Sequence, residues 1–106
     1  MFAVFLHLGF ENAILDSCNF SHMVLNDTCW KQSHLKACIF NETHLQKADF
    51  SGARLTQTLF HHSSLQGASE YAINPLTNKL NKAKFSQPEV MSLLQYLDII
   101  VESSPN

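Results

Sequence analysis

Six histidines and three cysteines are the side chains with the widest chemical range in this chain of 106 residues. Imidazole and thiolate groups can bind transition metals, and both can transfer protons. The cysteines, Cys18, Cys29 and Cys38, are odd in number and lack the CxxC spacing of a zinc or redox site. We therefore expect three reduced thiols and no metal site.

A potential nucleophile and base stand close together at Ser63 and Ser64, which follow His61 and His62. Catalytic Ser–His pairs depend on a spatial arrangement that also includes an oriented acid and an oxyanion site. Neither partner is evident in the sequence, and adjacency along the chain does not create that geometry. We expect that the protein is not an enzyme and uses no cofactor.

The elements that would position these side chains follow a period of five. A bulky apolar residue stands at every fifth position from Phe5 to Leu65. An α-helix would repeat every three to four residues and a β-strand every two, so neither explains the pattern. From the second member on, aromatic residues alternate with Leu, and we expect these residues to form a core ladder: Phe10, Leu15, Phe20, Leu25, Trp30, Leu35, Phe40, Leu45, Phe50, Leu55, Phe60 and Leu65.

The positions around each bulky residue also follow the period. A small residue usually stands two places before it, as at Ser33, Cys38 and Ala48, and the two places after it are mostly polar. A chain that bends at every repeat would point the bulky and small side chains into a narrow, densely packed core and the polar ones into water. The sequence therefore predicts a solenoid.

The five-residue pattern resembles that of the pentapeptide-repeat family, which has a small residue, Asp or Asn, Leu or Phe, and two polar residues. KADFS at 47–51 and SGARL at 51–55 are close matches, and the resemblance covers roughly residues 3–68. It implies an all-β solenoid, namely a right-handed quadrilateral β-helix of about three to four coils with a C-terminal capping α-helix. Apolar residues depart from the pattern before four of the central positions: Ile14, Val24, Ile39 and Leu59.

Coils of this family hold four repeats, so residues twenty apart would stack at about 4.8 Å. His22 and His62 would then share a column about 9.6 Å apart with Glu42 between them, and we interpret them as solvated. Cys18 and Cys38 would lie one coil apart, near enough for a disulfide in principle. Their place in the pattern favours small inward filler.

The pattern lapses at Glu70 and Pro75 and resumes at Leu80 and Phe85, which predicts a β-helix over residues 1–85 with a loop at about 69–79. Ser86 and a Glu three places later have the spacing of a capping box, so we expect a helix over about 87–97 that covers the last coil. Residues 86–106 would form this cap and a tail. The resemblance further implies a homodimer through residues 88–101, and the cap and dimer residues would be Val90, Met91, Leu93, Leu94, Leu97, Ile99 and Ile100.

Composition limits the possible partners and location. The net charge is −2 and 15% of residues are charged, so the chain has no basic face for nucleic acid. No apolar run reaches the roughly 18 residues of a membrane span, and we expect a cytoplasmic protein. The first residues already carry the repeat phase at Phe5 and have no polar lead-in. Residues 1–8 would therefore either contact another molecule or continue a longer rod.

The leading functional hypothesis is a non-enzymatic protein-interaction rod. Resemblance to quinolone-resistance members of the family, of the Qnr and MfpA types, implies DNA gyrase or topoisomerase IV as the partner and protection from fluoroquinolones. Strong DNA mimicry is not visible, because residues 1–68 carry five acidic and four basic side chains. The alternative is a structural or assembly module, or a fragment of a longer rod, for which outward Ile39 and Leu59 would form a contact.

Overall fold

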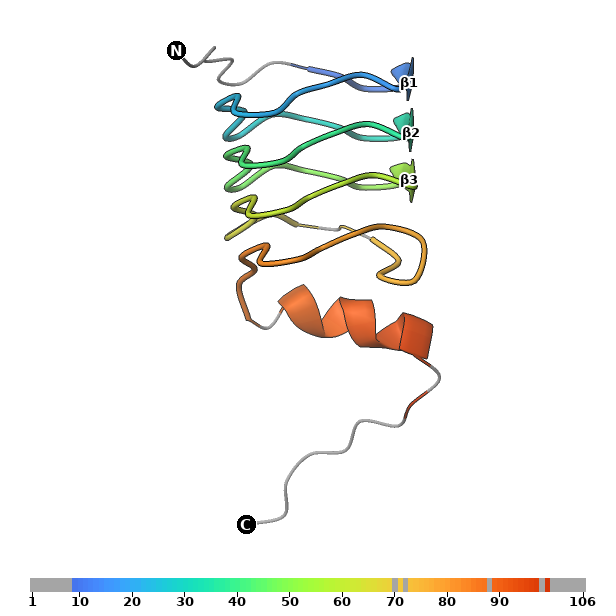
Figure 1. Ribbon diagram of the computed structural model, residues 1–106, viewed down its shortest axis with the longest axis vertical. Coiled ribbons are helices and arrows are strands. Elements are labelled where there is room, and N and C mark those ends of the chain that lie inside the picture. The colour runs from blue at the N-terminus through green and yellow to red at the C-terminus, as the bar shows by residue number, and fades with distance from the viewer. Residues whose placement is uncertain (1–8, 70, 72, 88, 98, 100–106) are drawn as a thin grey trace.

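Parallel strands stacked along one axis form the body of the computed structural model (Figure 1), which describes residues 9–69, 71, 73–87, 89–97 and 99. The three strands are β1 (Ile14–Asp16), β2 (His34–Lys36) and β3 (Arg54–Thr56), in the order β1-β2-β3. Leu15 pairs with Leu35, and Leu35 with Leu55. Each turn of the solenoid therefore takes twenty residues, as the family resemblance implies.

Three further ladders of parallel bridges complete the walls of the solenoid. One ladder begins Gly9–Cys29, one begins Asn19–Ile39 and one begins Val24–His44, and each continues in steps of twenty residues. The strands and these ladders start five residues apart along the chain, so four walls bound the core. The predicted N-terminal coil from Phe5 lies outside the described residues.

The chain bends between walls at residues with positive φ. These residues stand two places after each central position, and φ ranges from 54° at Ala37 to 75° at Gly67. Gly52 and Gly67 are the glycines among them, so most corners force an ordinary residue into the left-handed region that favours Gly. At ten corners the central carbonyl also accepts a hydrogen bond from the backbone N–H three places later, as in a type II turn.

The core is built from two aromatic stacks and two Leu columns. Trp30 stacks on Phe10 with ring centroids 4.1 Å apart, and Phe40 lies 5.1 Å from both Phe20 and Phe60. Rings of the two stacks meet edge to face. The buried members of the predicted ladder are Leu25, Trp30, Leu35, Phe40, Leu45, Phe50, Leu55, Phe60 and Leu65, whereas Phe10, Leu15 and Phe20 are half-buried.

Inward hydroxyls other than that of Thr58 are satisfied within their own corner. Thr28 donates to the carbonyl of Leu25 at 2.6 Å, and Ser33 donates to that of Trp30 at 2.7 Å. The indole N–H of Trp30 in turn donates to the Thr28 hydroxyl at 2.8 Å. A small polar residue can therefore occupy the core without leaving an unpaired group, which would cost about 1–3 kcal/mol.

A loop over residues 74–78 interrupts the regular coil at the position where the next strand of the β1–β3 wall would lie (Figure 1). The side chain of Asn74 accepts from the backbone N–H of Leu76, and its carbonyl accepts from those of Thr77 and Asn78. The solenoid register then resumes, because Leu59 bridges to Lys79.

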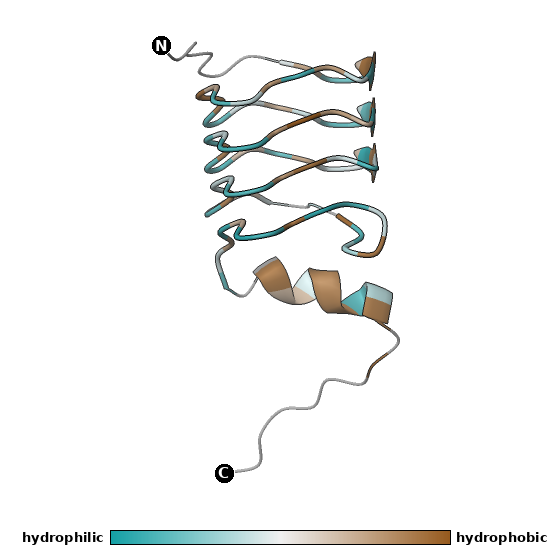
Figure 2. Cartoon of the chain, viewed as in Figure 1, coloured by the Kyte–Doolittle hydropathy of each residue, from teal (hydrophilic) through white to brown (hydrophobic). Residues whose placement is uncertain are grey.

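The segment after the last coil forms helix η1 (Glu89–Leu97), which Figure 2 shows as mainly hydrophobic. It is a 3₁₀ helix, so the predicted α-helix over 87–97 is wrong in type. Three residues per turn align Val90, Leu93 and Tyr96, of which Leu93 is buried and the other two are half-buried. The Ser86 hydroxyl of the predicted capping box accepts from the backbone N–H of Gly67 in the preceding coil at 2.9 Å, and the Glu side chain of that box lies outside the described residues.

Replacing Phe40 with Ala should lower the free energy of unfolding by about 3–5 kcal/mol, because a buried ring that packs in both aromatic stacks is lost. Gln57→Ala should change it little, since that side chain is exposed. Thermal melts of the two variants would measure the difference. Equal shifts would contradict a core defined by the five-residue period.

Candidate interaction surfaces

The described histidines do not assemble a metal site. His22 and Glu42 are neighbours on one corner, with Nδ1 and Oε2 2.9 Å apart, and both side chains are more than half exposed. Among residues 9–69 and the later described positions, no three His, Cys, Asp or Glu side chains are grouped closely enough to hold a metal ion. The contact is a solvent-exposed pair, of a kind that contributes little to stability.

The cysteines occupy ordinary positions in the walls and core. Cys38 is fully buried, and its thiol lies 3.6 Å from the carbonyl oxygens of Leu15 and Lys36. Burial raises the pKa of the Cys38 thiol, so this side chain is a weaker nucleophile than an exposed cysteine. Cys18 and Cys29 are half-buried, and all three thiols are free.

One acidic side chain is tied into a wall. The Asp49 carboxylate accepts from both the hydroxyl and the backbone N–H of Ser51, and Lys31 lies 3.7 Å away. The Ser51 hydroxyl is the largest influence that lowers the pKa of Asp49, with smaller contributions from the Ser51 N–H and Lys31 and a partial opposition from burial. This carboxylate is therefore committed to its own wall.

An apolar strip leads into a groove beside the loop at 74–78. Ile39 and Leu59 stand one coil apart in the same ladder and are half-buried. A groove of about 560 Å³ continues from Leu59 and is lined by Pro75, Leu76 and residues of the last coil. Leu76 is 69% exposed at its rim, so a large apolar side chain is available to another molecule here.

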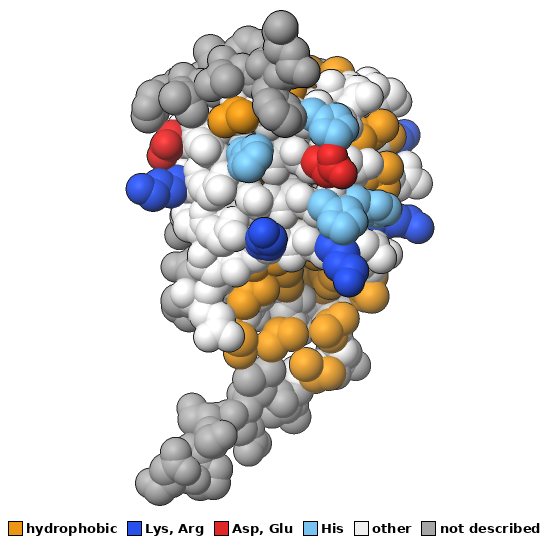
Figure 3. All heavy atoms as spheres, turned by 60° about the vertical axis from the view of Figure 1, so that its left-hand side comes forward, with side chains coloured by type: hydrophobic (Ala, Val, Ile, Leu, Met, Phe, Trp, Pro, Cys, Tyr) orange, Lys and Arg blue, Asp and Glu red, His pale blue; other side chains and the backbone are white. Residues whose placement is uncertain are grey.

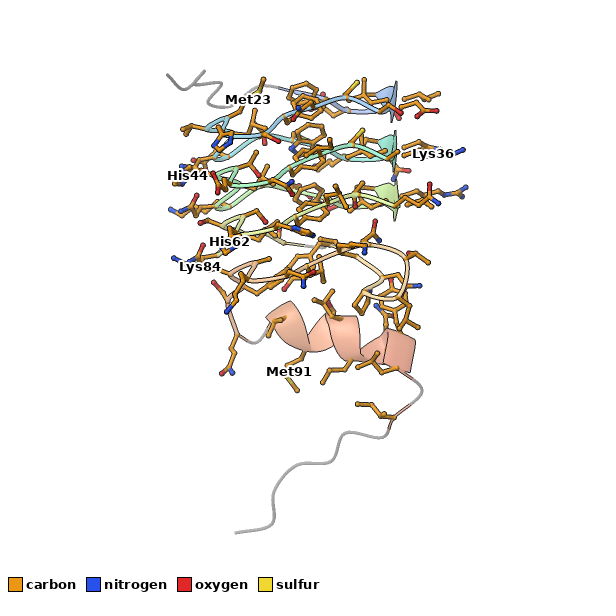
Figure 4. The ribbon with its side chains drawn as sticks, in the orientation of Figure 1. Met23, Lys36, His44, His62, Lys84 and Met91 are labelled. Carbon is orange, nitrogen blue, oxygen red and sulfur yellow. The ribbon has the colours of Figure 1, made fainter. Side chains whose placement is uncertain are left out.

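A second apolar area lies on η1 and just beyond its C-terminal end. Met91, Leu97 and Ile99 are 46%, 41% and 54% exposed, and Figure 4 shows Met91 pointing away from the coils. Of the other predicted cap and dimer residues, Leu93 is buried, Val90 and Leu94 are half-buried and Ile100 lies outside the described residues. The side of η1 that carries Leu93 therefore packs against the last coil, and the side that carries Met91 faces solvent.

Three residues near the loop have structural roles that the periodic pattern did not indicate. Tyr71 and Ile73 are buried below the regular coils, and the Tyr71 ring lies 5.4 Å from that of Phe85. Asn78 is also buried, and its side-chain amide takes over backbone partners of the β3 corner. Its position two before Leu80 was the available signal, because that position points inward throughout the pattern.

The geometry defines a parallel β-solenoid with apolar contact areas at the loop and at η1. The family model described as pentapeptide repeats (8 copies) matches residues 38–69. Residues 38–69 are therefore similar to the repeats of the pentapeptide-repeat proteins. No curated protein matches the chain in sequence. In the described residues no helix is long and apolar enough to cross a bilayer.

Similar solved structures have low sequence identity. A trypsin-treated variant of QnrB1, a plasmid-mediated fluoroquinolone resistance protein, is 13% identical with a TM-score of 0.42, over 90% of this chain and 72% of that one. Full-length QnrB1 is 13% identical with a TM-score of 0.32, over 91% and 88%. A pentapeptide repeat protein of the Arabidopsis thaliana thylakoid lumen is 20% identical with a TM-score of 0.35, over 72% and 57%.

Asn78→Ala should lower the free energy of unfolding by about 2–4 kcal/mol, because several buried groups lose their partner. The Asn78 side chain accepts from the backbone N–H and hydroxyl of Thr58 and donates to the carbonyl oxygens of Leu55 and Asn74. Urea unfolding would measure the loss, with Asn81→Ala as the exposed control. A control variant as unstable as Asn78→Ala would refute this role for the amide.

Proposed function

We propose that this protein is a non-enzymatic interaction rod that acts in the cytoplasm, with DNA gyrase or topoisomerase IV as its partner and fluoroquinolone protection as the result. The observation that carries the proposal is the apolar strip of Ile39 and Leu59 leading into the groove beside exposed Leu76. Backbone bonds between coils hold the walls rigid, so a partner meets a preformed surface. The rod would be a right-handed quadrilateral β-helix of about three to four coils.

Recognition by apolar contact fits the charges better than imitation of duplex DNA. Duplex DNA carries one charge per roughly 1.7 Å, so a mimic needs a dense acidic face. The described acidic side chains are spread around the rod: Asp16 lies on β1, Asp27 at one corner, Glu42 at another corner with His22, and Glu11 and Asp49 near Cys29, where Lys31 lies beside Asp49. These positions leave no acidic stripe in the part of the chain that the structure describes.

The alternative function is a structural or assembly module, or part of a longer rod, with no action on topoisomerases. The outward side chain of Ile14 on β1, which is 81% exposed, favours this reading because it offers an apolar contact near the opposite end of the described coils from the loop. A gyrase supercoiling assay distinguishes the two hypotheses, because an assembly module should have no effect on it.

A supercoiling assay with purified gyrase and a fluoroquinolone should show that the protein restores activity in a dose-dependent way. Leu76→Asp should weaken this protection at least tenfold, because it places a charge at the rim of the apolar groove. Ile14→Asp is the matched control, since it changes another exposed apolar residue, on β1 and away from the groove. Absence of protection by the intact protein would reject the topoisomerase hypothesis.

We further propose a homodimer through the outer face of η1. Met91 on η1 and Ile99, which follows the end of η1, expose about half of their surface, and burying them against a second copy would remove apolar area from water. Light scattering at tens of micromolar should give the dimer mass for the intact protein and the monomer mass for Met91→Glu with Ile99→Glu. Leu76→Asp should stay dimeric, and a monomeric intact protein would exclude this assembly.

A further inference from the structure

One face of the rod gathers histidine and lysine side chains, with acidic side chains among them (Figure 3). The corner column holds His22, Glu42, His62 and Lys82, and the next outward column includes His44 and Lys84. We call these six residues the histidine–lysine face. In Figure 4, His44, His62 and Lys84 lie on the opposite side of the rod from Lys36.

The backbone fixes these side chains in place. His22, Glu42 and His62 donate backbone N–H bonds to the following coil at 2.8–3.0 Å, and all three have positive φ. His44 and Lys84 donate backbone bonds to the preceding coil at 3.0 and 2.9 Å. Neighbours in a column are about 4.8 Å apart, so the face presents its charged groups in a preset array.

Most of the cationic groups on this face have no anionic partner. Lys82 and Lys84 are exposed and form no ion pair with a described acidic side chain, while Glu42 is taken by His22. The adjoining corner adds Asp27 and Lys47, which are one coil apart and both exposed. Three lysines thus face two carboxylates, in a chain whose net charge is −2.

Acidification increases this imbalance. Histidine is the side chain whose charge ordinarily changes between pH 5 and 8, and His61 lies beside the three histidines of the face. Each imidazole that gains a proton adds a positive charge next to Lys82, Lys84 or another histidine, and Glu42 and Asp27 are the carboxylates that face them. An anionic partner would therefore gain contacts as pH falls.

We propose that the histidine–lysine face binds an acidic polypeptide segment, more tightly at pH 5.5 than at pH 7.5. This inference rests on the proposed role as an interaction rod and names the chemistry of one partner surface. A polypeptide suits the face better than nucleic acid because duplex binding requires a strongly basic footprint.

Fluorescence anisotropy with a rhodamine-labelled octaglutamate peptide at low salt tests the proposal. The dissociation constant should be at least fivefold lower at pH 5.5 than at pH 7.5 and should rise with salt. His44→Gln with His62→Gln should remove most of the pH dependence, and Lys82→Ala with Lys84→Ala should weaken binding at both pH values. Lys36→Ala with Arg54→Ala removes the same charge from β2 and β3 and should change nothing.

Three results would overturn the proposal: pH-independent binding, equal loss in the Lys36 and Arg54 control, or tighter binding of a 20-base-pair DNA duplex through the same lysines. Thermal melts show whether each variant is folded, and these exposed side chains leave the core intact. If octaglutamate fails to bind while protection of gyrase still depends on Leu76, this inference fails and the proposed function stands.

Discussion

Every part of the solenoid depends on one constraint: each inward side chain must pack against the side chain twenty residues further along the chain. Trp30 stacks between Phe10 and Phe50, and Phe40 between Phe20 and Phe60, so a shift of one residue would break every ring contact in both stacks. The corners must accommodate this fixed step. Positive φ at ordinary residues is accepted because cross-coil hydrogen bonds and core packing outweigh its local strain.

The sequence reveals the β-solenoid because a regular step repeats the same packing problem many times. It does not reveal the left-handed corners, since Asn12, Glu42 and Lys47 have little in common and only their cross-coil pairing imposes positive φ. It also conceals Asn78, where a side chain replaces backbone partners that a regular coil would supply. Periodicity predicts structure only where a residue makes the same contacts as the residue twenty positions before it in its column.

The C-terminal cap illustrates the same limit. Ser86 and the following residues have a local pattern typical of an α-helix start, but Ser86 instead binds Gly67 of the coil above. The helix type follows from its packing, because Val90, Leu93 and Tyr96 align toward the coil only with three residues per turn. Exposed large apolar residues lie where the repeat is interrupted, at Leu76, and where it ends, at Met91. Ile14 on β1 is an exposed apolar residue within the regular coils. At the cap, packing against the last coil therefore outweighs the local preference of the sequence for an α-helix.

The orientation of the cross-coil hydrogen bonds has a mechanical consequence. These bonds join consecutive coils along the long axis of the rod (Figure 1), so an axial load passes through the junctions in series and the weakest junction ruptures first. At residues 74–78 a loop replaces a paired strand, so the Asn78 side chain carries part of the load there. A load across the long axis instead acts on many of these bonds at once, and they resist the sliding of one coil over the next together. The rod is therefore mechanically anisotropic, and one of its junctions depends in part on a single side chain.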